Sequence, residues 1–350
     1  MKHWPVLRHA VILAACMLLA ALAAGVAAAA EEGVTWKFAT LAPKSVGYAV
    51  NVREVLAPAL AEATDGRLHL KVYYGGIMGN DDDYVRKMSV GQLQGAGLTL
   101  VGANMISPDF SVLALPFLFR DFAEVDHVRD RLYREFDKSF RERGFKLVLW
   151  LDQDFDLFYS RKWRLDNFRD FARAKVLTWS GPIEQTWMRA LGISPIDLGV
   201  VEAPAAIRTG VADTNITTSI WQVGTQLHTI TKYVNLTKMR YSPAAVVVTE
   251  KAWDMLDPGH QKAVMNMRPE LERRFNRATR KDSRRCLDGM IRYGVTPVTT
   301  SDGFRQKMEA RCLPVHDELA GSVYDRDLLE LVRRTLEEYR SGSAEDGADR

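Results

Sequence analysis

Short apolar runs alternate with amphipathic segments along most of the chain after residue 32. The short runs are typical of buried strands, while the longer segments place apolar residues such as Val50, Val55 and Leu60 at helical spacing. The elements expected first are Val34–Thr40, Val46–Thr64, Leu68–Tyr74, Asn80–Leu93 and Ala96–Leu100. Because helices of this length alternate with strands, the pattern predicts right-handed crossovers, a parallel sheet and an α/β fold.

The same alternation continues through the middle of the chain. A helix is expected over Phe122–Arg143, and Asp154–Ser160, which alternates in polarity, is predicted to cross into a second domain. The further strands expected are Lys146–Leu151, Lys175–Thr178, Ser194–Asp197, Val211–Thr214, Tyr233–Lys238 and Ala244–Thr249, with helices at Ile183–Leu191 and Glu202–Thr209.

A long helix is predicted in the last third of the chain. Asp257 and Pro258 form a favourable cap and first turn, and Pro269 is expected to start a fresh or kinked helix that reaches Tyr293. At 1.5 Å per residue this helix is about 37 Å long, enough to lie across two small domains. A last helical region is expected over residues 302–339, with a break at Pro314.

The first thirty residues predict export. Lys2 and Arg8 precede an apolar run that ends 28-AAA-30, which fits a signal peptide cleaved after Ala30 and a periplasmic protein. A retained membrane anchor is one alternative. Lipoprotein anchoring at Cys16, within 13-LAAC-16, is another.

Charge and cysteine content add little to this picture. Removal of the first thirty residues leaves 45 basic and 44 acidic residues, a formal charge of +1, which does not favour nucleic acid as a partner. Cys286 and Cys312 then lie in an oxidising compartment, either as a disulfide or as two buried thiols.

Enzyme motifs are mostly absent from the sequence. It contains no G-x-S-x-G, G-x-x-x-x-G-K-[ST], H-E-x-x-H or C-x-x-C, and the histidines after residue 30 show no pair at helical ligand spacing. Asp81, Asp82 and Asp83 lack the alternating ligands of an EF-hand and fit a solvated helix start. The sequence therefore predicts no enzyme, no cofactor and no metal site.

Polar and aromatic residues gather where two predicted strands end. Thr178 and Trp179 follow one strand, within 175-KVLTWSGPIEQTWMRALG-192, and Thr214, Asn215 and Thr217 lead from another toward Trp221. The carboxyl ends of strands in an open α/β sheet form a crevice, which here suits a neutral or weakly polar ligand between aromatic walls. The alternative is that the tryptophans belong to the core and the threonines cap helices.

Several phrases in fixed order carry a family resemblance. They include 36-WKFATLAP-43, 74-YGGIMGNDDDYVRKMSVGQLQGAGLT-99, 113-LALPFLF-119, 144-GFKLVLW-150, 191-LGISPIDL-198, 207-IRTGVADT-214 and 232-KYVNLT-237. From about Trp36 to about Tyr324 the chain resembles the substrate-binding proteins of tripartite ATP-independent periplasmic (TRAP) transporters, the DctP-like family.

The resemblance implies a fold like that of type II periplasmic binding proteins, with two α/β domains joined by hinge strands and bridged by a long helix. The predicted division is a signal peptide at 1–30, domain I at 31–153 plus 243–268, and domain II at 154–242 plus 294–340. The bridging helix is 269–293, and the tail 341–350 is predicted to be disordered.

One position departs from the family pattern. Most members have arginine, which pairs with a ligand carboxylate, where this chain has Leu177. Leucine cannot compensate a buried carboxylate. Either another cation, Lys44 or Arg240, takes over this role, or the ligand is less acidic and more apolar, which is the reading we favour.

The predicted mechanism is hinge closure around a small organic ligand, followed by presentation to the TRAP permease. The residues expected at the ligand are Leu41, Lys44, Tyr48, Thr99, Phe117, Asp154, Leu177, Thr178, Trp179, Asn215, Thr217 and Trp221. The alternatives are an exported interaction protein, for example a partner of a periplasmic helical-repeat protein, and a periplasmic enzyme using Asp154 or Asp213.

Overall fold

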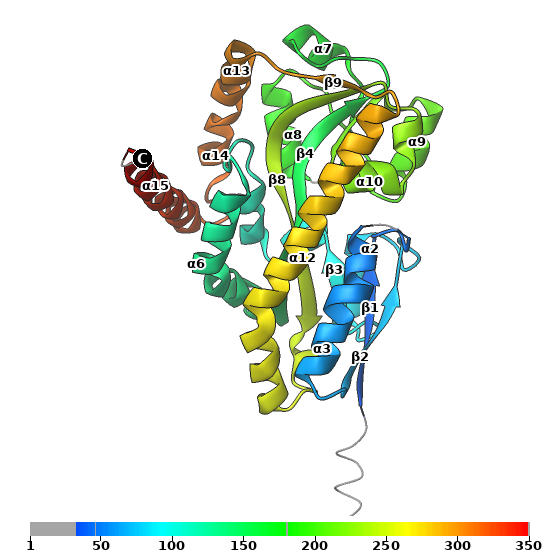
Figure 1. The fold of residues 1–350 in the computed structure, drawn as a ribbon, viewed down its shortest axis with the longest axis vertical. Coiled ribbons are helices and arrows are strands. Elements are labelled where there is room, and N and C mark those ends of the chain that lie inside the picture. Colours follow the sequence, from blue (N-terminus) through cyan, green and yellow to red (C-terminus); the bar gives the residue numbers. More distant parts are fainter. Residues whose placement is uncertain (1–32, 46, 180, 349–350) are drawn as a thin grey trace, which may run out of the picture.

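The computed structural model describes residues 33–45, 47–179 and 181–348, which form two α/β lobes around one mixed sheet (Figure 1). The strands are β1 (Val34–Thr40), β2 (Leu68–Tyr73), β3 (Gly95–Leu98), β4 (Phe145–Ser160), β5 (Val176–Thr178), β6 (Ile196–Asp197), β7 (Thr214–Thr217), β8 (Tyr233–Thr249) and β9 (Thr296–Val298). Their spatial order is β2-β1-β3-β8-β4-β7-β5-β6, and β9 pairs with β8.

Two long antiparallel strands, β4 and β8, run through both lobes and join them. The first lobe contains β1, β2 and β3, and the second contains β5, β6 and β7. The predicted parallel pairing is confirmed within each lobe, for β1 with β2 and β3 and for β5 with β6 and β7. It is wrong at the junction, where β3, β4, β7 and β8 pair antiparallel.

The long strands also correct the predicted breaks within them. Lys146–Leu151 and Asp154–Ser160 belong to one strand, as do Tyr233–Lys238 and Ala244–Thr249. The ladder between β4 and β8 has a register shift between Asp152 and Asp154, where the two predicted strands of the first pair meet. A bulge absorbs an extra residue without ending the strand, so the chain continues across the junction.

Helices cover the sheet in both lobes. The first lobe carries α2 (Tyr48–Asn51), the π-helical turn η1 (Val52–Leu56), α3 (Ala57–Ala63), α4 (Asp81–Ser89), α5 (Leu100–Ile106) and the 3₁₀ helix η2 (Pro108–Ala114). After α6 (Phe122–Arg141), the second lobe carries α7 (Phe168–Arg173), α8 (Pro182–Ala190), α9 (Ala203–Thr209), α10 (Ser219–Gly224) and η3 (Leu227–Thr229). Helix α4 begins just after Asn80, within the helix expected over Asn80–Leu93, and Asn80 and Asp83 form a reciprocal capping box.

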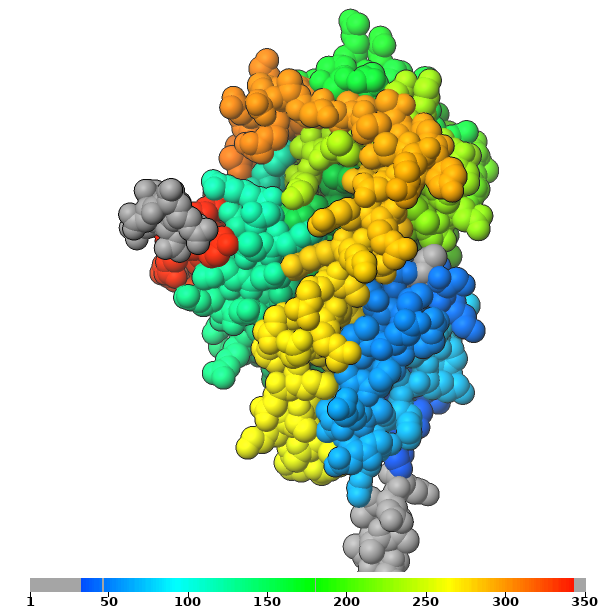
Figure 2. Space-filling model, in the orientation of Figure 1, coloured from blue at the N-terminus to red at the C-terminus, as the bar shows by residue number. Residues whose placement is uncertain are grey.

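Helix α12 (Pro258–Arg292) follows the short helix α11 (Glu250–Trp253) and lies diagonally across both lobes. Its residues form a yellow-to-orange band beside the blue first lobe in Figure 2. Asp257 caps it as predicted, accepting hydrogen bonds from the backbone N–H groups of Gly259 and His260. The expected fresh start at Pro269 is wrong, because the helix continues through that residue and its 35 residues span about 52 Å.

The C-terminal region consists of α13 (Asp302–Cys312), α14 (Pro314–Leu319) and α15 (Arg326–Ala348), with the expected break at Pro314. Helix α15 extends into the segment predicted to be a disordered tail.

Cys286 and Cys312 are free thiols, so they form no disulfide. Among the described residues, no helix is both long enough and apolar enough to cross a membrane. The predicted signal peptide and Cys16 lie outside the described residues.

Candidate ligand-binding site

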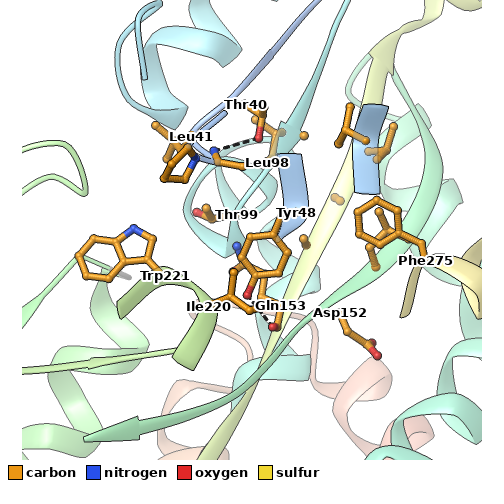
Figure 3. A pocket seen from close by; sticks show the side chains of 18 of the residues that line it. Thr40, Leu41, Tyr48, Leu98, Thr99, Asp152, Gln153, Ile220, Trp221 and Phe275 are labelled. Carbon is orange, nitrogen blue, oxygen red and sulfur yellow. Dashed lines mark hydrogen bonds between the residues drawn. The ribbon is translucent and has the colours of Figure 1, made fainter. Parts of the chain in front are cut away.

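The two lobes meet around a cleft with two adjoining chambers. The first chamber, of about 70 Å³, is mainly apolar and lies between β1, β3 and α2 of the first lobe and α10 of the second (Figure 3). Leu41, Leu98, Ile220 and Phe275 line it, and Tyr48 points into it. The surface is therefore suited to an apolar part of a ligand.

The second chamber, of about 30 Å³, is more polar. It shares Thr99, Gln153, Val200 and Trp221 with the first chamber, so the two are parts of one cleft. The residues that line only the second chamber are Leu100, Asp156, Trp179, Thr217, Thr218, Arg240 and Ser242. Hydroxyl groups, carboxylate and guanidinium thus surround one end of the cleft, and indole rings form its wall.

The indole wall consists of Trp179, just after β5, and Trp221 in α10. Their ring centroids are 5.1 Å apart at an interplanar angle of 40°. Both side chains are only partly buried. The pair offers a rigid, mostly apolar face to a ligand, with a large contact area and few rotatable bonds.

Direct contacts join the lobes on either side of the cleft. The Tyr48 hydroxyl donates to the backbone oxygen of Gln153 at 2.6 Å and lies 2.9 Å from the hydroxyl of Thr218, at the start of α10. The backbone N–H of Val201 donates to the side-chain oxygen of Asn80 at 3.1 Å. The lobes are therefore close together, and both chambers are smaller than the ~300–1,000 Å³ typical of ligand pockets.

Gly47 allows one of these close approaches. Its φ of +45° is unfavourable for other residues, and an added Cβ would lie 2.3 Å from Cγ2 of Ile220 in the second lobe. A side chain at this position would hold the lobes apart.

A buried ionic cluster lies at the polar end of the cleft. Arg240 of β8 is the register neighbour of Asp156 in β4, and its Nη2 lies 2.8 Å from Asp156 Oδ2 and 3.1 Å from Glu184 Oε1. All three side chains are less than 5% exposed. Burial raises the pKa of Asp156 to about 7, although the Arg240 guanidinium opposes this shift.

Six of the twelve residues expected at the ligand line the cleft. They are Leu41, Tyr48, Thr99, Trp179, Thr217 and Trp221. Thr217 was expected after a strand at 211–214, but β7 begins at Thr214 and contains it. The strand is shifted because residues 214–217 pair with β4, while Val211 is 53% exposed.

Three expected residues of the second lobe lie inside it rather than at the cleft. Leu177 is fully buried in a small apolar cluster with residues of α9. The Thr178 hydroxyl donates to Glu184 Oε2, and the Asn215 amide donates to Gln222 Oε1 at 2.9 Å. These polar contacts satisfy buried groups and hold the strand ends in place.

The other three expected residues also lie away from both chambers. Lys44 is exposed, and Phe117, with φ +59°, lines separate surface depressions near α13 and α14. Asp154 accepts a hydrogen bond from Ser283 of α12, and burial raises the pKa of its carboxyl to about 6. Its role here is to hold α12 against β4.

The sequence reasoning missed several residues that line the cleft, chiefly Gln153, Asp156, Val200, Ile220 and Ser242. Ser242 could have been found from the sequence. It lies two residues after Arg240, so both side chains are on the same face of β8. Asp156 carries no comparable signal. It reaches the cleft because β4 pairs with β8.

Within the part of the chain that the structure describes, no group of three or more His, Cys, Asp or Glu side chains is placed to hold a metal ion. The geometry is that of a binding cleft between two lobes that are joined by two long strands and bridged by one helix. That arrangement defines a two-lobed, type II-like binding protein.

Comparison with known proteins names the family. Residues 39–322 match the family DctP, described as bacterial extracellular solute-binding protein, family 7, and the chain belongs to this family. It is a TRAP-type solute-binding protein that takes a small organic ligand and works with a membrane permease. The family resemblance seen in the sequence is confirmed, whereas nothing in the comparisons supports a helical-repeat partner.

Three relatives show the range of similarity. The 2,3-diketo-L-gulonate-binding periplasmic protein YiaO of Escherichia coli is 24% identical over 249 residues, covering 69% of this chain and 74% of the relative. The C4-dicarboxylate-binding periplasmic protein DctP of Rhodobacter capsulatus is 24% identical over 279 residues, covering 78% and 83%. The crystal structure of the sugar acid binding protein DctPAm of Advenella mimigardefordensis with galactonate has a TM-score of 0.81, with 16% identity and coverage of 88% and 99%.

Proposed function

We propose that the ligand binds between the indole wall of the second lobe and the side chains of Leu41, Tyr48 and Thr99 in the first. The observation that carries this proposal is the continuous cleft at the lobe junction, apolar at one end and polar at the other. A ligand that contacts both lobes binds the closed arrangement more tightly than the open one, and it therefore stabilises the closed arrangement.

The hinge lies where β4 and β8 cross between the lobes, near residues 153 and 243. This position supports the division into domain I (31–153 plus 243–268) and domain II (154–242 plus 294–340). In this proposal, opening of the cleft admits the ligand, and closure presents both lobes to the permease.

We also propose that the protein reaches the periplasm through a signal peptide cleaved after Ala30, and that it binds its ligand without altering it. The family and its relatives are binding proteins. Export is supported by the basic start, the apolar run and the 28-AAA-30 end of the first thirty residues.

The test is to denature purified, undialysed protein and identify the released molecule by mass spectrometry. Thermal unfolding with 2,3-diketo-L-gulonate, galactonate, C4-dicarboxylates and uncharged sugars or polyols runs in parallel. We expect an unmodified small molecule, or a probe that raises the unfolding temperature in a concentration-dependent way. An empty protein that no probe stabilises would contradict the proposed binding function.

A further inference from the structure

The charges at the polar end of the cleft limit which ligands fit there, provided that the ligand binds in the cleft as proposed. Arg240 lies between two carboxylates, those of Asp156 and Glu184. Glu184 also accepts hydrogen bonds from the Thr178 hydroxyl and, at 3.4 Å, from the backbone N–H of Trp179. The guanidinium is therefore already engaged by acidic groups of the protein itself.

Protonation of Asp156 does not make this cluster positive. With Glu184 counted as a carboxylate, the three groups carry a net charge of −1 when Asp156 is ionised and zero when it is protonated. Burial raises the pKa of Asp156 to about 7, so both forms are populated near neutral pH. In either form a ligand carboxylate would meet no net positive charge from this cluster.

Among the described residues, no second cation compensates at the cleft. Arg240 is the only lysine or arginine among the described residues that line the two chambers. Lys44 is exposed and lines neither chamber, and the Lys238 ammonium lies over the Phe155 ring, 4.8 Å from its centroid. Transfer of a carboxylate from water into this end of the cleft would therefore lose hydration without gaining an ion pair.

The remaining surface favours uncharged groups. Thr217, Thr218 and Ser242 line the polar chamber with hydroxyl groups. Gln153 lines both chambers. The protonated Asp156 carboxyl can donate a hydrogen bond, and its ionised form can accept one from a ligand hydroxyl or amide. The indole pair and the apolar chamber complete a surface for a neutral molecule with one polar and one apolar end.

We propose that this protein selects an uncharged organic ligand, with hydroxyl or amide groups at the Asp156–Arg240 end and an apolar part in the chamber lined by Leu41 and Phe275. The acidic partners of Arg240 determine this specificity, because they neutralise the one cation, among the described residues of the cleft lining, that could hold a ligand carboxylate.

The experiment compares carboxylate and uncharged probes on the wild type and on a variant that releases Arg240. The probes are galactonate with galactitol and succinate with succinamide, tested by thermal shift and by calorimetric titration. Asp156→Asn/Glu184→Gln removes both acidic partners, and Asp156→Asn alone serves if the double variant does not fold. Asp137→Asn is the control, since it releases Lys146 from its 2.6 Å ion pair and neither residue lines the cleft.

We expect neither acid to stabilise the wild type more than its uncharged counterpart. The folded Arg240-releasing variant is expected to bind at least one of the two acids at least tenfold more tightly than the wild type does, and the control is expected to show no such gain. An acid that binds the wild type more tightly than its counterpart would overturn the proposal while leaving the binding function intact. The proposal would also be overturned if the folded variant that releases Arg240 bound neither acid more tightly than the wild type does. This outcome counts even if no probe binds the wild type.

Discussion

The side chains that meet at the cleft come from short segments whose local chemistry differs. Trp179 follows a three-residue strand and is partly exposed, whereas the neighbouring Leu177 and Thr178 are fully buried. A change at Trp179 therefore acts on the cleft surface, while a change at either neighbour acts on the interior of the second lobe.

We expect Trp179→Ala to weaken binding of the recovered ligand about tenfold or more, because the ligand loses one of two indole faces. The variant should remain folded. Trp163→Ala is the matched control, because Trp163 lies in the same lobe, donates to Asp213 at 3.2 Å and lines neither chamber. Calorimetric titration with the recovered ligand measures the affinity of both variants. If a folded Trp179→Ala binds the ligand as tightly as the wild type does, the indole wall is not part of the binding site.

At the scale of elements, α12 is tied to β4 by side chains that bond the strand's backbone. Glu272 Oε1 accepts from the N–H of Trp150 at 2.8 Å, and Asn276 Oδ1 accepts from the N–H of Asp152 at 2.9 Å. The spacing of four residues places both acceptors on one face of the helix. These bonds satisfy N–H groups near the register shifts in β4, so the helix supports the strand where its ladder is irregular.

Arg280 adds a charged contact to the same helix face. Its Nε donates to Asp152 Oδ2 at 2.6 Å, and Asp152 is completely buried. We expect Arg280→Met to lower the free energy of unfolding by on the order of 2–4 kcal/mol, because it leaves a buried carboxylate with fewer partners. The lower end allows for the 18% exposure of the Arg280 side chain.

Arg277→Met provides the comparison on the same helix. Its side chain is 65% exposed and pairs with Glu270 at 3.4 Å, so its loss should change stability by less than about 0.5 kcal/mol. Urea unfolding of both variants measures the difference. Similar values for the two would mean that the contact of Arg280 with Asp152 contributes no more to stability than an exposed ion pair of the same helix.

For the whole molecule, the proposed closure involves groups that face each other across the lobes. The Tyr48 hydroxyl contacts Gln153 and Thr218 at once, and Gly47 lies directly beside Ile220. The contact of Tyr48 with Thr218 is broken when the lobes separate, whereas most of the apolar core lies within the lobes or along β4 and β8. We therefore expect such contacts to affect closure more than folding.

We expect Tyr48→Phe to weaken ligand binding about three- to tenfold, which corresponds to the loss of about 0.5–1.5 kcal/mol of hydrogen bonding. Small-angle scattering should show less compaction on ligand addition than for the wild type at the same ligand concentration. Tyr293→Phe, at a side chain that is 90% exposed, is the control. Wild-type affinity and compaction in Tyr48→Phe would show that this bridge does not contribute to closure.

Local sequence signals predicted many elements well. The caps at Asn80 and Asp257 act on N–H groups a few residues away, so neighbouring residues suffice to identify them. The predicted start of β7 at Val211 was wrong. Val211 was included because it is apolar, whereas the burial of Thr214 depends on pairing with β4. Strand limits depend on partners that are distant in the chain, and the sequence pattern does not contain them.

The sequence alone determined the α/β alternation, the bridging helix and the family, because each rests on local periodicity or on phrases in a fixed order. Only the tertiary structure decided which side chains meet at the cleft. Asp156 and Arg240 are neighbours because β4 and β8 run antiparallel through both lobes. Asn215 lies inside the second lobe, where its amide donates a hydrogen bond to Gln222. The charge at the polar end of the cleft follows from that pairing, since two remote strands and α8 bring its three ionisable groups together.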